Sequence, residues 1–124
     1  MVNSKKIYFA HPIKTYNTDL ETELIAKIKE KFPTAEITNP KDIRSHNFKD
    51  FYSVIAGCDL IIFYGYSIGV ISEIYFAKLV QIPIIDAETM TDVTAEKRNG
   101  LFTAYEQNNY FSKDIQKMQE VIEQ

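Results

Sequence analysis

The carboxylate best suited to chemistry in this chain is Glu73, which lies in the otherwise apolar and small-residue run YSIGVISEIYFA at residues 66–77. It is about one turn into a predicted helix, and helical side chains lean toward the helix N-terminus. We therefore expect it to point back at the turn, where the helix dipole and unpaired N–H groups favour its charged form. An ionised carboxylate in a cleft can act as a nucleophile or general base. The plainer alternative is an acid that only stabilises the helix.

The residues around this helix start favour the functional interpretation. Gly69 removes a side chain where a ligand would approach, and Ser67 supplies a hydroxyl and a helix cap. Tyr8, near the end of the first predicted strand, is expected to face the same space. Tyr66 is close enough to the turn to contact a base, although tyrosines of this region are more typical of core or subunit contacts.

Two basic side chains follow the first predicted strand and are candidates for substrate binding. Lys14 can meet a phosphate as a point charge, but it lacks the planar fork of an arginine. His11 can bind a phosphate or a base. A lone histidine at a strand end is at least as often a satisfied structural residue, so both interpretations of His11 stay open.

Two aspartates compete for the role of a second catalytic carboxylate. Asp59 opens a predicted strand, which puts it at the edge of the sheet away from the ligand crevice. Asp50 lies in the first turn of a helix that starts from the crevice side, so geometry favours Asp50 as the functional acid. A charge that only stabilises the helix N-terminus is the equally weighted alternative for Asp50.

Hydrophobic patterns predict short strands alternating with amphipathic helices. Thr18 and Glu21 have the spacing of a capping box, Pro33 ends the helix that begins there, and Ser112 is the expected N-cap of the last helix. Residues 87–110 are the least readable part of the chain. The predicted strands are residues 6–10, 35–38, 59–64 and 82–86; the other predicted segments are a polar loop at 41–47, helices at 48–56 and 69–81, and a short helix at 94–97.

This alternation predicts an α/β fold, an open parallel sheet of flavodoxin-like type with helices on both faces. With four or five strands, the expected order is 2-1-3-4. Ligands in such sheets bind beyond the carboxyl ends of the strands where the order reverses, which here is between strands 1 and 3.

Length and composition bound the remaining possibilities. The 124 residues are expected to form one domain over residues 1–124, and the net charge of −3 gives no sign of a nucleic-acid or membrane partner. Cys58 is the single cysteine, which excludes an internal disulfide and suits a reducing, cytoplasmic location. No apolar run reaches membrane-spanning length. No Gly-rich phosphate loop or metal-ligand spacing is present, so we expect no cofactor and no metal.

Two segments, KIYFAHP and NFKDFYSVIAGCDLIIFYGYSIGVISEIYFAKLVQIPII, resemble the nucleoside 2-deoxyribosyltransferase superfamily. They are most similar to the branch that hydrolyses the N-glycosidic bond of 2'-deoxynucleoside 5'-monophosphates. The resemblance runs over most of residues 5–86. The matching positions, in order, are Tyr8, Asp50, Asp59, Ser67, Gly69, Glu73 and Pro83.

The resemblance implies a mechanism in which Glu73 attacks the anomeric carbon of a 2-deoxyribosyl group and expels the base, while Tyr8 fixes its rotamer. It also implies a homodimer or higher homo-oligomer. Two departures matter. His11-Pro12-Ile13-Lys14 stands where the nucleotide-hydrolysing branch has Gly-Ser-x-Arg, which weakens the expectation of 5'-phosphate specificity. Ser67 stands where the transferase branch has Asp, which argues against base exchange as the main activity.

Two other functions fit the same residues. A glutamate at a helix start in a flavodoxin-like sheet also suits cleavage of NAD or a cyclic ADP-ribose relative, as in TIR-like domains. The crevice could alternatively bind a nucleotide derivative without cleaving it, with Glu73 contacting a ribose hydroxyl.

Overall fold

A computed structural model describes residues 5–43, 48–92, 95–108 and 111–123. Its centre is a five-stranded sheet in the order β2-β1-β3-β4-β5. The first four strands pair in parallel, and β5 pairs antiparallel with β4 at the edge. The predicted α/β fold and strand order are therefore confirmed. The strands are β1 (Lys6–Ala10), β2 (Glu36–Thr38), β3 (Leu60–Phe63), β4 (Ile84–Asp86) and β5 (Thr91–Asp92).

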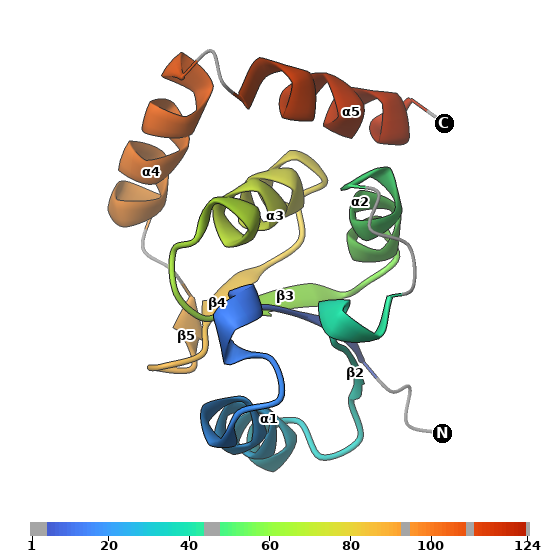
Figure 1. Ribbon diagram of the computed structural model, residues 1–124, viewed down its shortest axis with the longest axis vertical. Helices are drawn as coiled ribbons and strands as arrows, with labels where there is room; N and C mark the ends of the chain where they lie inside the picture. Colours follow the sequence, from blue (N-terminus) through green and yellow to red (C-terminus); the bar gives the residue numbers. More distant parts are fainter. Residues whose placement is uncertain (1–4, 44–47, 93–94, 109–110, 124) are drawn as a thin grey trace.

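Helices cover the two faces of the sheet unequally (Figure 1). One face is covered by α1 (Asp19–Lys31). The other face carries α2 (Phe48–Ala56) and α3 (Ile68–Leu79), and a further layer made of α4 (Ala95–Gln107) and α5 (Ser112–Ile122) lies outside them. Two short 3-10 helices, η1 (Ile13–Thr15) and η2 (Pro40–Asp42), follow β1 and β2.

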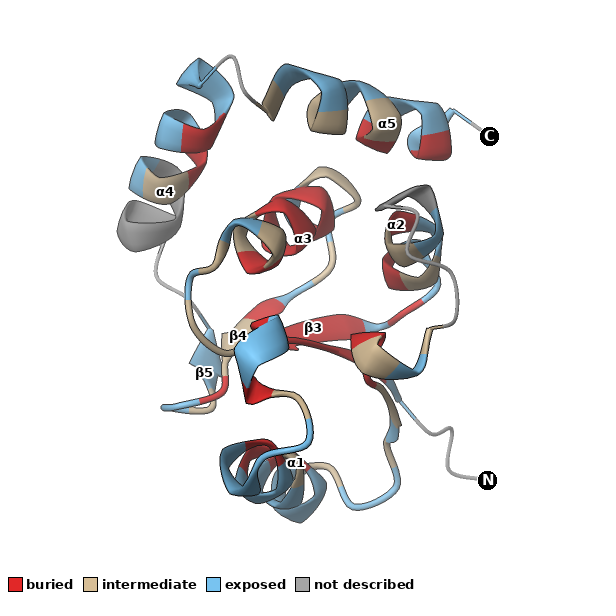
Figure 2. Ribbon diagram, viewed as in Figure 1, coloured by how far each residue is buried: buried red, intermediate tan, exposed pale blue. Residues whose placement is uncertain are grey.

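The position of α3 explains why its sequence is apolar all round. It lies between the sheet and the outer helices, and Figure 2 shows most of its ribbon as buried. A helix that packs on two sides has no wide wet face, so its hydrophobic residues do not follow an amphipathic stripe. A carboxylate on α3 is therefore surrounded by packed side chains, and Glu73 is 8% exposed.

Alternation along β1 directs its side chains to two separate cores. Ile7 and Phe9 join the hydrophobic cluster on the α1 side. Tyr8 and Ala10 join the larger cluster with α2, α3 and the outer helices. Tyr8 is thus aimed at the helix that carries Glu73.

Residues 87–110 and the start of the last helix differ most from the sequence predictions. Residues 87–110 were expected to hold only a short helix at 94–97, and that prediction was wrong in extent, because they form β5 and the 13-residue helix α4. α4 packs chiefly on α3 through Phe102 and Tyr105. Its apolar residues are therefore too few to predict a helix from their spacing. Ser112 is the first residue of α5 and not its N-cap, a position taken by Phe111 without a side-chain cap.

The other predicted segments are confirmed to within two residues at each end. Thr18 caps α1 as expected, since its hydroxyl oxygen accepts a hydrogen bond from the Glu21 N–H at 3.2 Å. The Glu21 carboxylate does not accept the hydrogen bond from the Thr18 N–H that a capping box has. It accepts one from the Asn17 N–H at 3.2 Å instead. Residues 44–47 of the predicted loop and residue 94 of the predicted short helix lie outside the described residues.

Candidate active site

Glu73 and Tyr8 meet between α3 and β1. Ser67 caps α3, its hydroxyl oxygen accepting from the Val70 N–H at 3.3 Å, and Glu73 follows about one and a half turns later. The Tyr8 hydroxyl donates a hydrogen bond to Glu73 Oε2. Both side chains are buried, so the contact predicted between them from the sequence is present in the fold.

The surroundings of Glu73 favour its neutral form more than the sequence suggested. Burial raises the pKa of Glu73 to about 7, and the hydrogen bond from Tyr8 lowers it only in part. The helix dipole acts mainly within the first turn, and Glu73 lies beyond that turn. Burial also raises the pKa of Tyr8, as does the neighbouring Glu73 carboxylate, so the phenol stays a donor at neutral pH.

A cavity of about 550 Å³ opens at the carboxyl ends of β1, β3 and β4. This is the reversal of strand order at which open α/β sheets bind ligands. Lys14, Tyr66 and Ser67 of the predicted binding residues line it, whereas Glu73 and Tyr8 do not. The lining consists of Pro12, Lys14, Thr15, Leu20, residues 63–67, Asp86 and Glu88.

Two glycines near this cavity have different roles. Gly65 has a φ of 76°, and a Cβ there would lie 3.1 Å from Cγ of Pro12, so the turn after β3 packs closely on the segment after β1. A Cβ on Gly69 would meet open space. The room that the sequence predicted beside the start of α3 therefore exists, although nothing in the fold demands glycine there.

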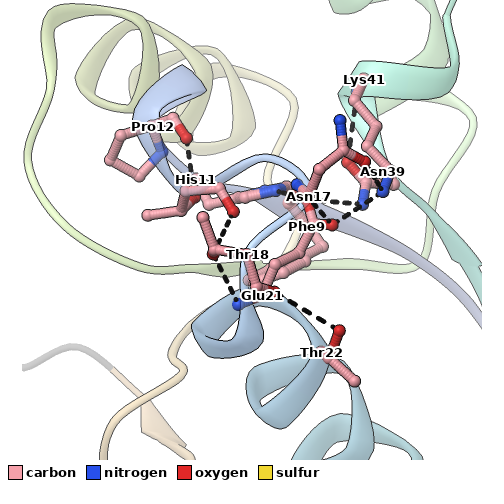
Figure 3. Close-up of polar contacts among 10 residues, drawn as sticks. Phe9, His11, Pro12, Asn17, Thr18, Glu21, Thr22, Asn39 and Lys41 are labelled. Carbon is pink, nitrogen blue, oxygen red and sulfur yellow. Dashed lines mark hydrogen bonds and ion pairs between the residues drawn. The ribbon is translucent and has the colours of Figure 1, made fainter.

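His11 lies apart from the cavity and is buried in a polar network (Figure 3). Its ring stacks on Phe9, with centroids 4.2 Å apart. Nδ1 lies 2.9 Å from the Phe9 carbonyl oxygen and Nε2 lies 2.8 Å from Glu21 Oε2. Both ring nitrogens are therefore occupied by protein groups, which matches the structural alternative weighed for His11.

Glu21 is the centre of that network. Lys41 donates to its Oε1 at 2.7 Å, and Asn39 donates to its Oε2 at 3.3 Å. Burial raises the pKa of Glu21, but the hydrogen bonds from Lys41, His11, Asn39 and the Asn17 N–H outweigh it and lower the pKa to about 2. The sequence showed Glu21 only as a capping-box residue, because its side-chain partners lie in the two connections that follow β1 and β2.

Tyr16 is a second residue that the sequence analysis missed. Its ring is tilted against His11 at a centroid distance of 4.9 Å. Burial raises the pKa of Tyr16 to about 12, with further contributions from the Glu73 and Glu21 carboxylates. The ring of Tyr16 therefore packs against the network around Glu21, and the sequence around it carries no signal for this contact.

The two aspartates lie in different parts of the fold. Asp59 precedes β3, and its Oδ2 accepts a hydrogen bond from the Lys6 N–H at 2.7 Å, as expected of a group at the start of a strand. Asp50 is exposed in the first turn of α2 and does not line the cavity. Its proposed role as an acid stays a prediction.

Within the described part of the chain, no group of three or more His, Cys, Asp or Glu side chains is arranged to hold a metal ion. No helix formed by the described residues is long and apolar enough to cross a membrane.

Comparison with known proteins gives information on the fold alone. No protein-family model and no curated protein matches the chain. One similar solved structure is a conserved protein from Enterococcus faecalis V583, with a TM-score of 0.58 and 21% sequence identity. The similarity covers 68% of this chain and 63% of the other, so the chain spans less than two thirds of that protein.

Proposed function

We propose that this protein is an N-glycosidase that cleaves the base–sugar bond of a 2'-deoxynucleoside or its 5'-monophosphate, with Glu73 as nucleophile. The observation that carries the proposal is the buried hydrogen bond from the Tyr8 hydroxyl to Glu73 Oε2. It is supported by the ordered match of Tyr8, Ser67, Gly69 and Glu73 to the family pattern. The structural similarity to the Enterococcus protein supports the fold and not the activity.

The two carboxylate oxygens of Glu73 have different roles in the proposed reaction. Tyr8 holds Oε2 and orients the carboxylate, and Oε1 forms a bond to the anomeric carbon as the bond from that carbon to the base nitrogen breaks. The base leaves with the bonding electron pair and takes a proton, for which Asp50 is the proposed acid. Water then attacks the anomeric carbon and gives a proton to the Asp50 carboxylate, the bond from that carbon to Glu73 Oε1 breaks, and the sugar leaves with a new hydroxyl, as in retaining glycosidases.

Access to Glu73 is part of the proposal, because the 550 Å³ cavity does not include it. Pro12, Lys14 and Thr15 line the cavity, and the Glu73 carboxylate contributes to the raised pKa of Tyr16 in the same segment, residues 12–16. We therefore place the substrate's sugar at this segment, which has to shift for the anomeric carbon to reach Oε1.

Exposed apolar side chains near the cavity support the proposed homo-oligomer. Ile13 is 78% exposed and Ile68 is 59% exposed, and each adjoins residues that line the cavity. A second subunit packed here would bury them and close the site. Sedimentation velocity should show a dimer or larger species, and a monomer at micromolar concentration contradicts this part of the proposal.

The test incubates purified protein with the four common 2'-deoxynucleosides, their 5'-monophosphates and NAD, and detects free base by chromatography. Glu73→Gln should lower base release by at least about 10³-fold, which corresponds to about 4 kcal/mol in the activation barrier. The matched control is Glu36→Gln, an exposed acid at the start of β2, which should leave the rate unchanged. Unchanged release by Glu73→Gln overturns the proposal, and nicotinamide as the sole product would indicate the NAD-cleaving alternative.

A second candidate is a protein that binds a nucleotide derivative without cleaving it. The observation in its favour is that the cavity and the Tyr8–Glu73 pair are separate in the fold. Recovery of intact ligand after tight binding, with no free base, would support this candidate against the glycosidase.

A further inference from the structure

A single carboxylate holds both ends of the connection between β1 and α1. Glu21 Oε2 lies 2.8 Å from Nε2 of His11, the first residue after β1, and Oε1 accepts a hydrogen bond from the Asn17 N–H at 3.2 Å. Residues 11–17 therefore form a loop whose two ends meet at one side chain (Figure 3). Lys41 also binds at this junction, because its Nζ donates to Asn17 Oδ1 at 3.1 Å as well as to the carboxylate.

The loop of residues 11–17 forms part of the wall of the cavity at the strand ends. Pro12, Lys14 and Thr15 line that cavity. The turn η1 within the loop has its own backbone hydrogen bonds, such as the one from the Thr15 N–H to the Pro12 carbonyl oxygen at 3.0 Å. Those bonds are internal to the loop, whereas the bonds to Glu21 tie the loop to α1. The contacts of Glu21 therefore control where this wall of the cavity lies.

The hydrogen bonds of His11 require a proton on each ring nitrogen. Nδ1 lies 2.9 Å from the Phe9 carbonyl oxygen, and a carbonyl oxygen can only accept a hydrogen bond. Nε2 faces an oxygen of Glu21, whose pKa of about 2 keeps the carboxylate ionised at neutral pH. An ionised carboxylate can also only accept. A neutral imidazole has one N–H, so both contacts are hydrogen bonds only when the ring is an imidazolium.

The groups around the ring are suited to hold this cation. The side chain of His11 is 0% exposed, so its charge has to be stabilised by protein groups. α1 supplies the Glu21 carboxylate, η2 supplies Lys41 on the other oxygen of that carboxylate, and the uncharged ring of Tyr16 packs on the imidazole. β1 supplies the stacked ring of Phe9, which does not titrate. The contact with Glu21 is therefore the one that offsets the cost of burying the charge.

We propose that His11 is held as an imidazolium cation and that its ion pair with Glu21 is a clasp that keeps residues 11–17 closed on the cavity. Loss of the proton from either ring nitrogen leaves two acceptors facing each other at hydrogen-bond distance, so the loop opens at its base. The clasp goes beyond the proposed function, because it is a property of the fold that needs no substrate. It also identifies what has to be released if this loop shifts to admit a sugar to Glu73.

The first experiment determines the protonation state of His11 by heteronuclear NMR, on wild-type protein labelled at its histidine nitrogens and held at pH 7. Both ring nitrogens of His11 should show the chemical shift and the one-bond coupling of a protonated nitrogen. A ring with one unprotonated nitrogen overturns the proposal. This measurement needs no variant, so it decides the charge of His11 even if substitution of this buried residue prevents folding.

The second experiment measures opening of the loop by amide hydrogen exchange in His11→Gln, whose neutral side chain cannot form the ion pair. The Asn17 N–H, bonded to Glu21 Oε1, should exchange at least tenfold faster than in wild type. The reference is the Ala87 N–H, which is bonded to the Phe63 carbonyl oxygen at 2.8 Å and reports on general loss of stability.

The ratio of the two exchange rates decides the result. A rise at Asn17 that exceeds the rise at Ala87 at least tenfold supports the clasp, and a smaller difference overturns it. Lys31→Met is the control variant and should leave the ratio unchanged, since Lys31 donates to the Met90 carbonyl oxygen. Neither experiment depends on base release, so failure of the clasp leaves the N-glycosidase standing, and absence of base release leaves the clasp standing.

Discussion

Glu21 and Glu73 are two buried carboxylates that approach β1 from opposite faces of the sheet, one on α1 and the other on α3. They are 3% and 8% exposed, so burial alone does not distinguish them. Yet the pKa of Glu21 is lowered to about 2 and that of Glu73 is raised to about 7. Burial raises the pKa of both carboxylates, and the hydrogen bonds that oppose it outweigh it at Glu21 but not at Glu73.

Glu21 is surrounded by donors that include the ammonium group of Lys41, and they stabilise its ionised form in place of water. For Glu73, the hydrogen bond that counters burial comes from one neutral phenol, that of Tyr8. A fully compensated carboxylate is inert and holds segments together, whereas an undercompensated one near pH 7 is suited to chemistry. The comparison therefore indicates a structural role for Glu21 and supports the proposal that Glu73 is the nucleophile.

The largest expected effect on stability is that of Glu21→Gln. Removal of the charge leaves the buried end of the network without the carboxylate that Lys41, His11 and Asn39 contact, and such losses cost about 3 kcal/mol. Urea denaturation at pH 7 should show this loss in the free energy of unfolding. Glu73→Gln is the matched variant, and it should keep or raise stability at pH 8, because it removes an undercompensated charge. A loss of equal size in both variants would contradict the comparison.

The two glutamates should also give opposite dependences of stability on pH. Glu21 has a folded pKa below its unfolded value, so its contribution is present above about pH 4.5 and is lost as pH falls toward 2. Glu73 has a folded pKa above its unfolded value, so its contribution is present below about pH 4.5 and is lost as pH rises to about 7. Each change is on the order of 3 kcal/mol.

The free energy of unfolding is measured for wild type and for each Gln variant across pH 3–8. The difference between wild type and variant gives the contribution of each glutamate. The Glu21→Gln difference should shrink toward acid, and the Glu73→Gln difference should appear between pH 4.5 and 7. Parallel curves for wild type and Glu73→Gln would mean that this glutamate titrates normally.

A smaller effect is expected for Lys41→Met. Lys41 is the charged donor to Glu21, but its side chain is 27% exposed and partly solvated, so the loss should be about 1–2 kcal/mol. The loss of stability at acid pH should begin at a higher pH, because removal of Lys41 raises the pKa of Glu21. Lys31→Met is the control, since Lys31 bonds the Met90 carbonyl oxygen and not a carboxylate.

Tyr8→Phe is the mildest change that tests the role of Glu73. Loss of the donor should raise the pKa of Glu73 further, because the hydrogen bond from Tyr8 is what lowers it. The ionised nucleophile would then form at higher pH, so the rise in kcat with pH should shift upward and the rate at pH 7 should fall about tenfold. A lower rate with an unshifted pH profile would show that Tyr8 has only a packing role.

The sequence predicted the framework well because its signals are local. Strand runs such as residues 59–64 and the Thr18 cap identify elements directly, and their alternation leads to the strand order. The Tyr8–Glu73 contact followed from a family pattern that joins two elements. The network around Glu21 could not be predicted, since His11, Asn39 and Lys41 converge on it only after the sheet has formed.

The C-terminal third was predicted least well for a related reason. α4 is held mainly by aromatic contacts such as those of Tyr75 with Phe102 and Tyr105, and by the hydrogen bond from Tyr75 to Glu106 at 2.7 Å. A helix that packs mainly on one neighbour needs few apolar residues. Its periodicity is therefore weak, and the outer layer that buries α3 is not apparent from the sequence.

The sheet ends on both sides in very short strands, with three residues in β2 and two in β5. Edge strands of this length offer few free backbone groups to a neighbouring chain, and the exposed acids Glu36 and Asp92 on them add repulsion between copies. Concentrated solutions of the folded protein should consequently resist strand-to-strand aggregation.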